Sequence, residues 1–370
     1  METRENSEIA KLGFGLMRLP RKGVRIDVAQ VSQMVDMFLE AGFTYFDTAR
    51  IYPGSEAATR KALVTRHPRD SYVIATKLNT MIAPTPKLAR RQIDTSLRNL
   101  GCDYIDYYLL HSLTPASYKS YDALKLWDYV ADLKRTGKVC NYGFSFHAGP
   151  QLLDKILTDH PDVDFVQLQI NYADWDNPRI TSRANYEVAR AHGKPIVVME
   201  PVKGGTLANP APKIRELMEE ANPGASPASW AIRFAASLEG ILTVLSGMSN
   251  VEQMADNISY MRDFKPLDDD EMEVIRQVRE IAGDSKDIPC TACGYCREGC
   301  PKQIPIPDVF AAMNKQLVGG QMEEARVAYR QAVAGVSPAS ACIACGTCEA
   351  TCPQHIDIIA QLRECATALE

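Results

Sequence analysis

The sequence contains no uninterrupted run of about 18 apolar residues, so it predicts no transmembrane helix. Residues 1–10 are polar and charged and lack the apolar core of a secretion signal. The net charge is only −5, and no basic stripe marks a surface for nucleic acid. We therefore expect a cytoplasmic protein that works neither in a membrane nor on nucleic acid.

A glycine-rich dinucleotide fingerprint after the first apolar run is also missing, which argues against a doubly wound open sheet. Short apolar runs rich in β-branched and aromatic residues alternate instead with amphipathic stretches, as expected for strands that are buried on both faces. Eight such alternations within about 270 residues predict an α/β fold, a (β/α)8 TIM barrel. The predicted strands are 12–17, 43–46, 72–75, 105–110, 139–144, 165–170, 196–199 and 241–245.

Helix-start signals separate several of these runs. Asp27 begins a capping-box pattern ahead of residues 28–41. Thr85 and Ser226 are each followed by a proline, which predicts an N-cap and a helix that begins at the proline.

The composition changes near residues 282–287, where we place the domain boundary. We expect the barrel to occupy residues 1–283 and a smaller, mainly α-helical domain to occupy residues 284–370. Two apolar-periodic stretches, 309–318 and 321–333, predict two helices in the smaller domain.

The smaller domain contains eight of the eleven cysteines, in two copies of one pattern, C-x2-C-x2-C-x3-C-P. This pattern supplies thiolates to [4Fe–4S] clusters. Zinc is the alternative, but a third cysteine and a Cys-Pro pair exceed what a four-ligand zinc site needs. The predicted ligands of two [4Fe–4S] clusters are Cys290, Cys293, Cys296, Cys300, Cys342, Cys345, Cys348 and Cys352.

In two-cluster ferredoxins the fourth cysteine of each run ligates the partner cluster. We therefore expect Cys352 to join the first three cysteines of the first run, and Cys300 to join the first three of the second. Two helices between the runs make the segment similar to the α-helical ferredoxin domain of succinate dehydrogenase-type iron–sulfur subunits. Gly294 and Gly346 stand where the backbone is expected to pass close to a cluster.

Four polar residues lie at or just after predicted strands, where barrel enzymes place their catalytic groups: Asp47, Tyr52, Lys77 and His111. Each alone has a structural interpretation, as an ion pair, a packed aromatic or a core histidine. Together, at successive strand ends, they favour an active site.

Residues 47–56, Asp-Thr-Ala-Arg-Ile-Tyr-Pro-Gly-Ser-Glu, resemble the D-T-A-x-x-Y-G-x-S-E signature of the aldo-keto reductases. The resemblance covers about residues 8–282 and implies that a nicotinamide cofactor and a small carbonyl or alcohol substrate meet on the barrel. It implies that Tyr52 is the general acid/base, that His111 aligns the carbonyl, and that Asp47 orients Lys77. A lysine ammonium beside Tyr52 is expected to lower the pKa of that tyrosine.

The same resemblance implies which residues contact NADP or NAD: Ser145, Gln167, Lys203, Gly247, Ser249, Asn250, Gln253 and Asn257. Three residues depart from the family pattern. Phe146 replaces an asparagine, Met199 replaces a stacking aromatic, and Ser249 replaces the cation that pairs with a 2′-phosphate. The choice between NAD and NADP therefore stays open, and Lys203 is either a phosphate contact or a solvated loop residue.

Three hypotheses connect barrel and clusters. In the first, a carbonyl reductase exchanges electrons through its clusters with a redox partner protein or a flavin carrier. In the second, the same reductase has clusters that only brace the C-terminal domain. In the third, the barrel is an inherited scaffold and the chain is a non-enzymatic electron-transfer or docking subunit.

Overall fold

The computed structural model describes residues 9–282 and 286–370. Parallel strands close into a barrel in the order β1-β10-β9-β8-β7-β6-β5-β4. All eight predicted strands are present in this (β/α)8 TIM barrel, with ends that shift by a few residues. Their bounds are β1 Leu12–Gly15, β4 Tyr45–Asp47, β5 Val73–Leu78, β6 Ile105–Leu113, β7 Val139–Phe146, β8 Phe165–Gln169, β9 Ile196–Met199 and β10 Ile241–Ser246.

Side chains alternate along each barrel strand between the interior and the surrounding helices. Tyr45, Ala75, Leu109, Phe165 and Val197 belong to one buried cluster that fills the barrel interior. The residue two positions further along each strand faces the same way, one layer nearer the carboxyl ends. That layer contains, in the same order, Asp47, Lys77, His111, Gln167 and Met199.

Helices cover the outside of the barrel, and the three predicted N-caps are confirmed. Asp27, Thr85 and Ser226 each accept a hydrogen bond from a backbone N–H of the first helical turn. The hairpin of β2 (Arg21–Lys22) and β3 (Arg25–Ile26) lies outside the barrel sheet. The helices of the barrel domain are α1 Val28–Glu40, α2 Ser55–Thr59, α3 Pro86–Leu100, α4 Tyr118–Ala123, α5 Leu126–Arg135, α6 Pro150–Asp159, α7 Ser182–Ala191, α8 Pro212–Ala221, α9 Pro227–Ser237, α10 Val251–Met261 and α11 Asp269–Ala282.

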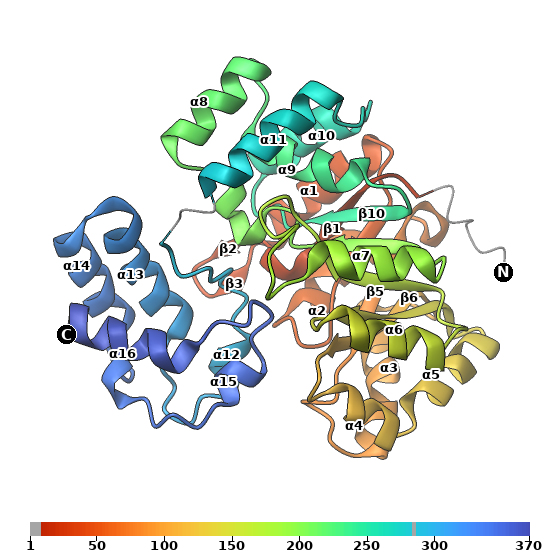
Figure 1. The fold of residues 1–370 in the computed structure, drawn as a ribbon. Helices are drawn as coiled ribbons and strands as arrows, with labels where there is room; N and C mark the ends of the chain where they lie inside the picture. The colour runs from red at the N-terminus through yellow and green to blue at the C-terminus, as the bar shows by residue number, and fades with distance from the viewer. Residues whose placement is uncertain (1–8, 283–285) are drawn as a thin grey trace.

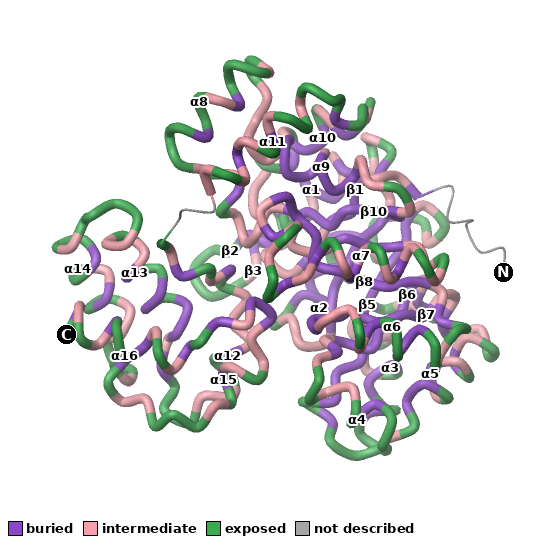
Figure 2. Tube along the Cα trace, in the orientation of Figure 1, coloured by how far each residue is buried: buried purple, intermediate pink, exposed green. Residues whose placement is uncertain are grey.

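The C-terminal domain is helical and has an apolar core separate from that of the barrel, formed around Phe310 and Leu362 (Figure 2). The two predicted helices are present as α13 and α14. The predicted boundary after residue 283 lies outside the described residues. The helices of this domain are α12 Tyr295–Glu298, α13 Ile306–Gly319, α14 Met322–Ala332, α15 Thr347–Ala350 and α16 Ile358–Leu369.

Figure 1 shows the short helices α12 and α15 on the side of the C-terminal domain that faces the barrel. The contact joins this domain to the carboxyl ends of the barrel strands. Arg18 donates to the carbonyl of Thr291 over 2.5 Å, and the side-chain amides of Gln169 and Gln354 bond each other at 3.2 Å. Along the described parts of the chain, no helix has the length and apolar character needed to cross a membrane.

Candidate active site and cluster sites

A buried ion pair forms the floor of the candidate active site. Lys77 Nζ donates to Asp47 Oδ1 over 2.6 Å and to the carbonyl of Thr48 over 2.7 Å. The side chains of Lys77 and Asp47 are only 1% and 5% exposed. Because β4 and β5 are parallel neighbours, their carboxyl ends bring these two charges together.

Tyr52 lies above this pair on the loop between β4 and α2. The loop closes in a turn in which Ser55 N–H donates to the Tyr52 carbonyl, and Gly54 supplies a positive φ of 77°. Lys77 Nζ is 5.1 Å from the centre of the Tyr52 ring, and the rings of Tyr52 and His111 meet edge to face at 5.9 Å. The four predicted catalytic residues are therefore gathered at one end of the barrel.

The other residues of the 47–56 segment hold this loop in place. The hydroxyl groups of Thr48 and Ser55 are 2.7 Å apart, and Ser55 also donates to the carbonyl of Leu16. Buried Glu56 accepts from Thr76 and from Asn99. The motif is thus a set of mutually bonded polar groups that fixes Tyr52 over Lys77.

Burial and pairing act in opposite directions on the ion pair. Loss of hydration raises the pKa of Asp47 and lowers the pKa of Lys77, whereas the attraction between the two groups opposes both shifts. The 2.6 Å contact and the second bond to the Thr48 carbonyl favour the charged form of Lys77.

The expected lowering of the Tyr52 pKa is not found. Burial raises the pKa of Tyr52 well above 10.0, and Tyr295 and Asp47 add to the rise. The expectation considered only the lysine cation and omitted both desolvation and the second tyrosine. Burial likewise lowers the pKa of His111 well below 6.5, with Lys77 contributing, so His111 is neutral near pH 7.

Tyr295, from the C-terminal domain, reaches into this group. Its hydroxyl is 3.2 Å from His111 Nε2, and a hydrogen bond joins it to Tyr52. The ring of Tyr295 also meets the ring of His111 edge to face at 6.1 Å. No sequence pattern marks this residue as part of the site, because it lies within the first cysteine run, 184 positions from His111.

A cleft of about 320 Å³ opens beside Tyr52, within the range of ligand-binding pockets. Five of the predicted dinucleotide contacts line it: Gln167, Gly247, Ser249, Gln253 and Asn257. Met199 and Arg18 line it as well, and so do Cys293 and Tyr295 of the C-terminal domain. The cleft therefore lies between the two domains.

Several of the predicted contacts already have partners within the protein. Ser145 Oγ accepts from the N–H of Ser112 over 2.7 Å. Asn250 caps α10, and its side chain accepts from the N–H of Gln253. Asn257 donates to Ser246 over 2.6 Å. Gly247 and the N-terminus of α10 still offer the setting in which backbone N–H groups bind an anion.

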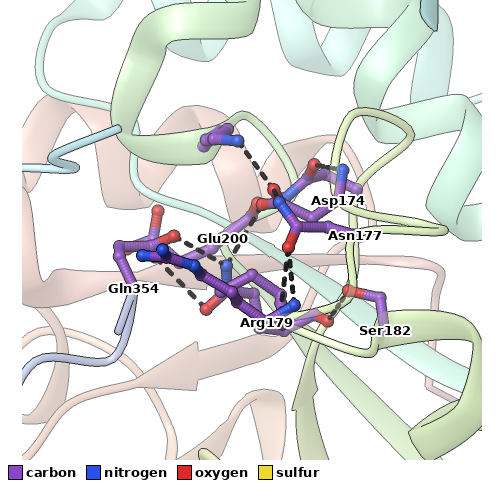
Figure 3. Close-up of polar contacts among 10 residues, drawn as sticks. Asp174, Asn177, Arg179, Ser182, Glu200 and Gln354 are labelled. Carbon is purple, nitrogen blue, oxygen red and sulfur yellow. Dashed lines mark hydrogen bonds and ion pairs between the residues drawn. The ribbon is translucent and has the colours of Figure 1, made fainter. Parts of the chain in front are cut away.

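Lys203 is engaged by a buried carboxylate. Its Nζ is 2.6 Å from Asp174 Oδ1, and Asp174 also accepts from Asn171 and Gln169. Figure 3 shows Asp174 and Glu200 close to Gln354 of the C-terminal domain. Lys203 is thus paired within the barrel, beside the Gln169–Gln354 contact between the domains, and its role as a phosphate contact stays a prediction.

A second cavity, of about 250 Å³, lies on the other side of Tyr295. The loops that follow β4, β5 and β6 line it together with α12 and α15. Its apolar residues include Ile51, Met81, Ile82 and Ala116, and Tyr295 is the residue that it shares with the first cleft.

The eight cysteines of the two runs form two groups. Cys290, Cys293, Cys296 and Cys352 surround one small cavity. Cys300, Cys342, Cys345 and Cys348 surround another. The structure thus exchanges the fourth cysteine between the runs, in the arrangement expected from the sequence.

Both runs fold with the same unusual backbone. Ala292 and Ala344 have φ angles of 53° and 54°, and Gly294 and Gly346 have φ angles of 81° and 78°. A Cβ at either glycine would meet nothing within 4 Å, so the left-handed backbone rather than lack of space requires glycine there. The repeated geometry turns the thiols of each group towards a common centre.

The donor set of each group fits a [4Fe–4S] cluster, since four thiolates are its usual ligands. Among the described residues, no three metal-binding side chains converge closely enough for a single ion. A cluster needs a wider spacing, because iron and sulfide atoms separate its ligands. Cys293 borders the cleft beside Tyr52, whereas Cys345 in the other group is exposed.

Two family models match the chain. The model described as "Aldo/keto reductase family" matches residues 11–280, and the model described as "4Fe-4S dicluster domain" matches residues 289–356. The second match covers both cysteine groups.

Individual relatives resemble the barrel part. The aldo-keto reductase str7 of Strobilurus tenacellus is 29% identical over 215 residues, which cover 54% of this chain and 60% of that protein. An aldo-keto reductase of Mycobacterium avium (strain 104) is 26% identical over 278 residues, 75% of this chain and 88% of the relative. The crystal structure of a Klebsiella pneumoniae aldo/keto reductase, in complex with NADP and acetate, has a TM-score of 0.60 and 19% identity. It covers 73% of this chain and 92% of that one, and at this identity the likeness concerns the fold.

Proposed function

Because the chain belongs to the aldo/keto reductase family and carries a 4Fe-4S dicluster domain, we propose that it interconverts a carbonyl and an alcohol with a nicotinamide dinucleotide. The observation that carries the proposal is the grouping of Tyr52, His111 and the Lys77–Asp47 pair beside a cleft of about 320 Å³.

In this proposal Tyr52 donates its proton to the carbonyl oxygen as negative charge develops there. The raised pKa of Tyr52 keeps the phenol protonated near neutral pH, so the proton is present when it is needed. Neutral His111 donates its N–H to the same oxygen. Lys77, held by Asp47, places a positive charge 5.1 Å from the Tyr52 ring and stabilises the phenolate that remains.

The dinucleotide, when bound, supplies or accepts the hydride. Gln167 at the end of β8 and Met199 at the end of β9 would contact its nicotinamide, and Gly247 and α10 would hold its phosphates. A Klebsiella relative binds NADP. Ser249 gives this chain an uncharged side chain where a 2′-phosphate needs a cation, so we leave the choice between NADP and NAD to the test below.

We further propose that two [4Fe–4S] clusters exchange electrons with this site. The supporting observation is that Cys293 lines the same cleft as Tyr52. Cys293 belongs to the group of Cys290, Cys293, Cys296 and Cys352, called the inner group below. A hydride carries two electrons in one step and a [4Fe–4S] cluster accepts one, so a flavin carrier would have to join the two steps. The outer group, formed by Cys300, Cys342, Cys345 and Cys348, includes exposed Cys345 and would face a flavin carrier or a redox partner protein.

The proposal is tested with anaerobically purified protein, NADH or NADPH, and a panel of aldehydes. Tyr52→Phe should lower kcat by about 10²- to 10⁴-fold, the usual contribution of a general acid. Dinucleotide binding, followed by fluorescence, should be retained. If Tyr52→Phe turns over as fast as the wild type, Tyr52 is not the general acid, and the proposal is contradicted.

Bracing clusters remain the second candidate, since the C-terminal domain has its own small core. Cys293→Ala distinguishes the two roles. If the variant loses iron and C-terminal structure but keeps dinucleotide-dependent turnover, the clusters brace the domain. The third hypothesis, a non-enzymatic subunit, is motivated by Phe146, Met199 and Ser249 and fails if Tyr52→Phe abolishes a measurable reaction.

A further inference from the structure

Tyr295 brings a phenol of the cluster-bearing domain to the two proton donors of the barrel. Its hydroxyl lies 3.2 Å from His111 Nε2 and is hydrogen-bonded to Tyr52. No barrel element supplies this group: Tyr295 is the first residue of α12, between Cys293 and Cys296. A hydroxyl in this position has the same two neighbours as a carbonyl oxygen that accepts from Tyr52 and His111.

The two donors cannot serve both oxygens at once. A phenol has one proton to donate, and a neutral imidazole has one N–H. Nδ1 of His111 has no hydrogen-bond partner, so the polar contact of this ring in the described structure is made through Nε2, to Tyr295. A substrate oxygen must therefore replace the Tyr295 hydroxyl rather than join it.

We propose that the Tyr295 hydroxyl occupies the carbonyl-oxygen position of the active site, so that substrate binds only when Tyr295 withdraws. The inference rests on the proposed function, because that function assigns the oxygen position to Tyr52 and His111. It makes the cluster-bearing domain a determinant of substrate binding in addition to any role in electron exchange.

The surroundings of Tyr295 indicate what enters when it moves. The second cavity lies on one side of the ring and the dinucleotide cleft on the other, and Tyr295 borders both. Withdrawal of the ring joins the two spaces. The joined space places the apolar wall of Ile51, Met81 and Ile82 next to Tyr52, which suits a compact uncharged carbonyl with an aromatic or alkyl body.

The backbone around Tyr295 fixes the point from which this side chain extends into the barrel site. Gly294 caps α12 with a φ of 81°, and Cys293 and Cys296 on either side belong to the inner thiol group. A ligand held by both cysteines would anchor the short segment between them. Cluster binding by the inner thiol group and occupancy of the carbonyl-oxygen position by Tyr295 therefore involve the same few residues.

The first experiment compares benzaldehyde kinetics of the wild type, Tyr295→Phe and Tyr295→Ala with saturating NADPH or NADH. Loss of the competing hydroxyl should lower KM about tenfold, since one net hydrogen bond no longer has to be displaced, while kcat is retained. A fall in kcat with unchanged KM would make Tyr295 a donor to the substrate and overturn the proposal. Iron content and the visible absorbance of the clusters verify that each variant is loaded.

Tyr329→Phe is the matched control. Tyr329 is a buried tyrosine of the same domain, and its hydroxyl bonds Glu370 within the separate C-terminal core, away from the barrel site. This variant should leave KM for benzaldehyde unchanged. An equal fall in KM for Tyr329→Phe and Tyr295→Phe would assign the effect to a loosened domain and overturn the proposal.

The second experiment needs no turnover and separates this inference from the proposed function. Benzoate is the probe, because its carboxylate accepts from Tyr52 and His111 and its ring fits the apolar wall. By calorimetry, Tyr295→Ala and Tyr295→Phe should each bind benzoate about tenfold more tightly than the wild type. If no variant reduces an aldehyde but both bind benzoate more tightly, the proposed function fails and the occupied oxygen position stands. Unchanged or weaker benzoate binding in both variants would overturn the inference, whatever their turnover.

Discussion

Lys77 Nζ lies 2.6 Å from Asp47 Oδ1, and both side chains are almost completely shielded from solvent. Removal of one partner from such a pair leaves an uncompensated buried charge. Lys77→Met should therefore lower the free energy of unfolding by roughly 3–5 kcal/mol, measured by urea denaturation. Lys138→Met is the control, because Lys138 forms an exposed pair with Asp94 at 3.1 Å and its loss should change stability little. Equal effects of the two substitutions would contradict the structural role assigned to the buried pair.

Ser249 tests the choice of dinucleotide. It lines the cleft, and its hydroxyl donates to the carbonyl of Arg18 over 2.8 Å. Ser249→Arg introduces a guanidinium that can pair with a 2′-phosphate, so the Kd for NADPH should fall about tenfold relative to that for NADH. Ser249→Ala controls for loss of the hydroxyl and should change the Kd for NADPH and the Kd for NADH by the same factor. If Ser249→Arg leaves the ratio of the two Kd values unchanged, the 2′-phosphate does not bind next to residue 249.

His147 predicts a loss of stability in acid. Burial lowers the pKa of His147 from 6.5 to about 4, with His355 contributing. Below pH 6.5, the pKa of this histidine in the unfolded chain, the unfolded chain binds a proton that the folded protein does not. The free energy of unfolding therefore falls as the pH drops. Between about pH 7 and about pH 5 this group removes about 2 kcal/mol from the free energy of unfolding. His147→Asn should lose correspondingly less than the wild type over this interval in urea denaturation, and an identical loss would contradict the assignment.

Gly204 of the barrel packs directly against Thr291 of the C-terminal domain. A Cβ there would lie 2.7 Å from Thr291 Cα, whereas a Cβ at Gly205 would meet nothing within 4 Å. Both glycines have positive φ, so an alanine at either position carries similar backbone strain. Gly204→Ala should therefore speed amide hydrogen exchange in residues 286–298 more than Gly205→Ala does. Equal exchange in the two variants would show that this contact does not hold the domains together.

Much of the fold was predictable because its signals are local. The alternation of apolar runs and the caps at Asp27, Thr85 and Ser226 each depend on a few neighbouring residues. The layer that contains Asp47 and Lys77 follows from the same alternation, since each is two residues beyond a buried interior side chain. The two cysteine groups were predictable because one spacing rule covers both runs.

The junction of the domains was not predictable from such signals. Tyr295 and His111 are 184 positions apart, and Gln169 and Gln354 are 185 apart. Neither Tyr295 nor Gln354 carries a pattern that names its partner. The same contact helps to explain why the pKa of Tyr52 moves opposite to the expectation from Lys77, because burial and then Tyr295 raise it.

The most direct test of the account is an anaerobic titration of the iron-loaded protein with NADPH and with NADH, followed by the visible absorbance of the clusters. The shared cleft of Cys293 and Tyr52 predicts bleaching as dinucleotide is added, with a carbonyl substrate or a flavin present where the dinucleotide alone does not suffice. Tyr52→Phe should bind dinucleotide but fail to turn over an aldehyde under the same conditions. Cluster absorbance that stays constant with either dinucleotide, with and without substrate or flavin, would contradict electron exchange between the two domains.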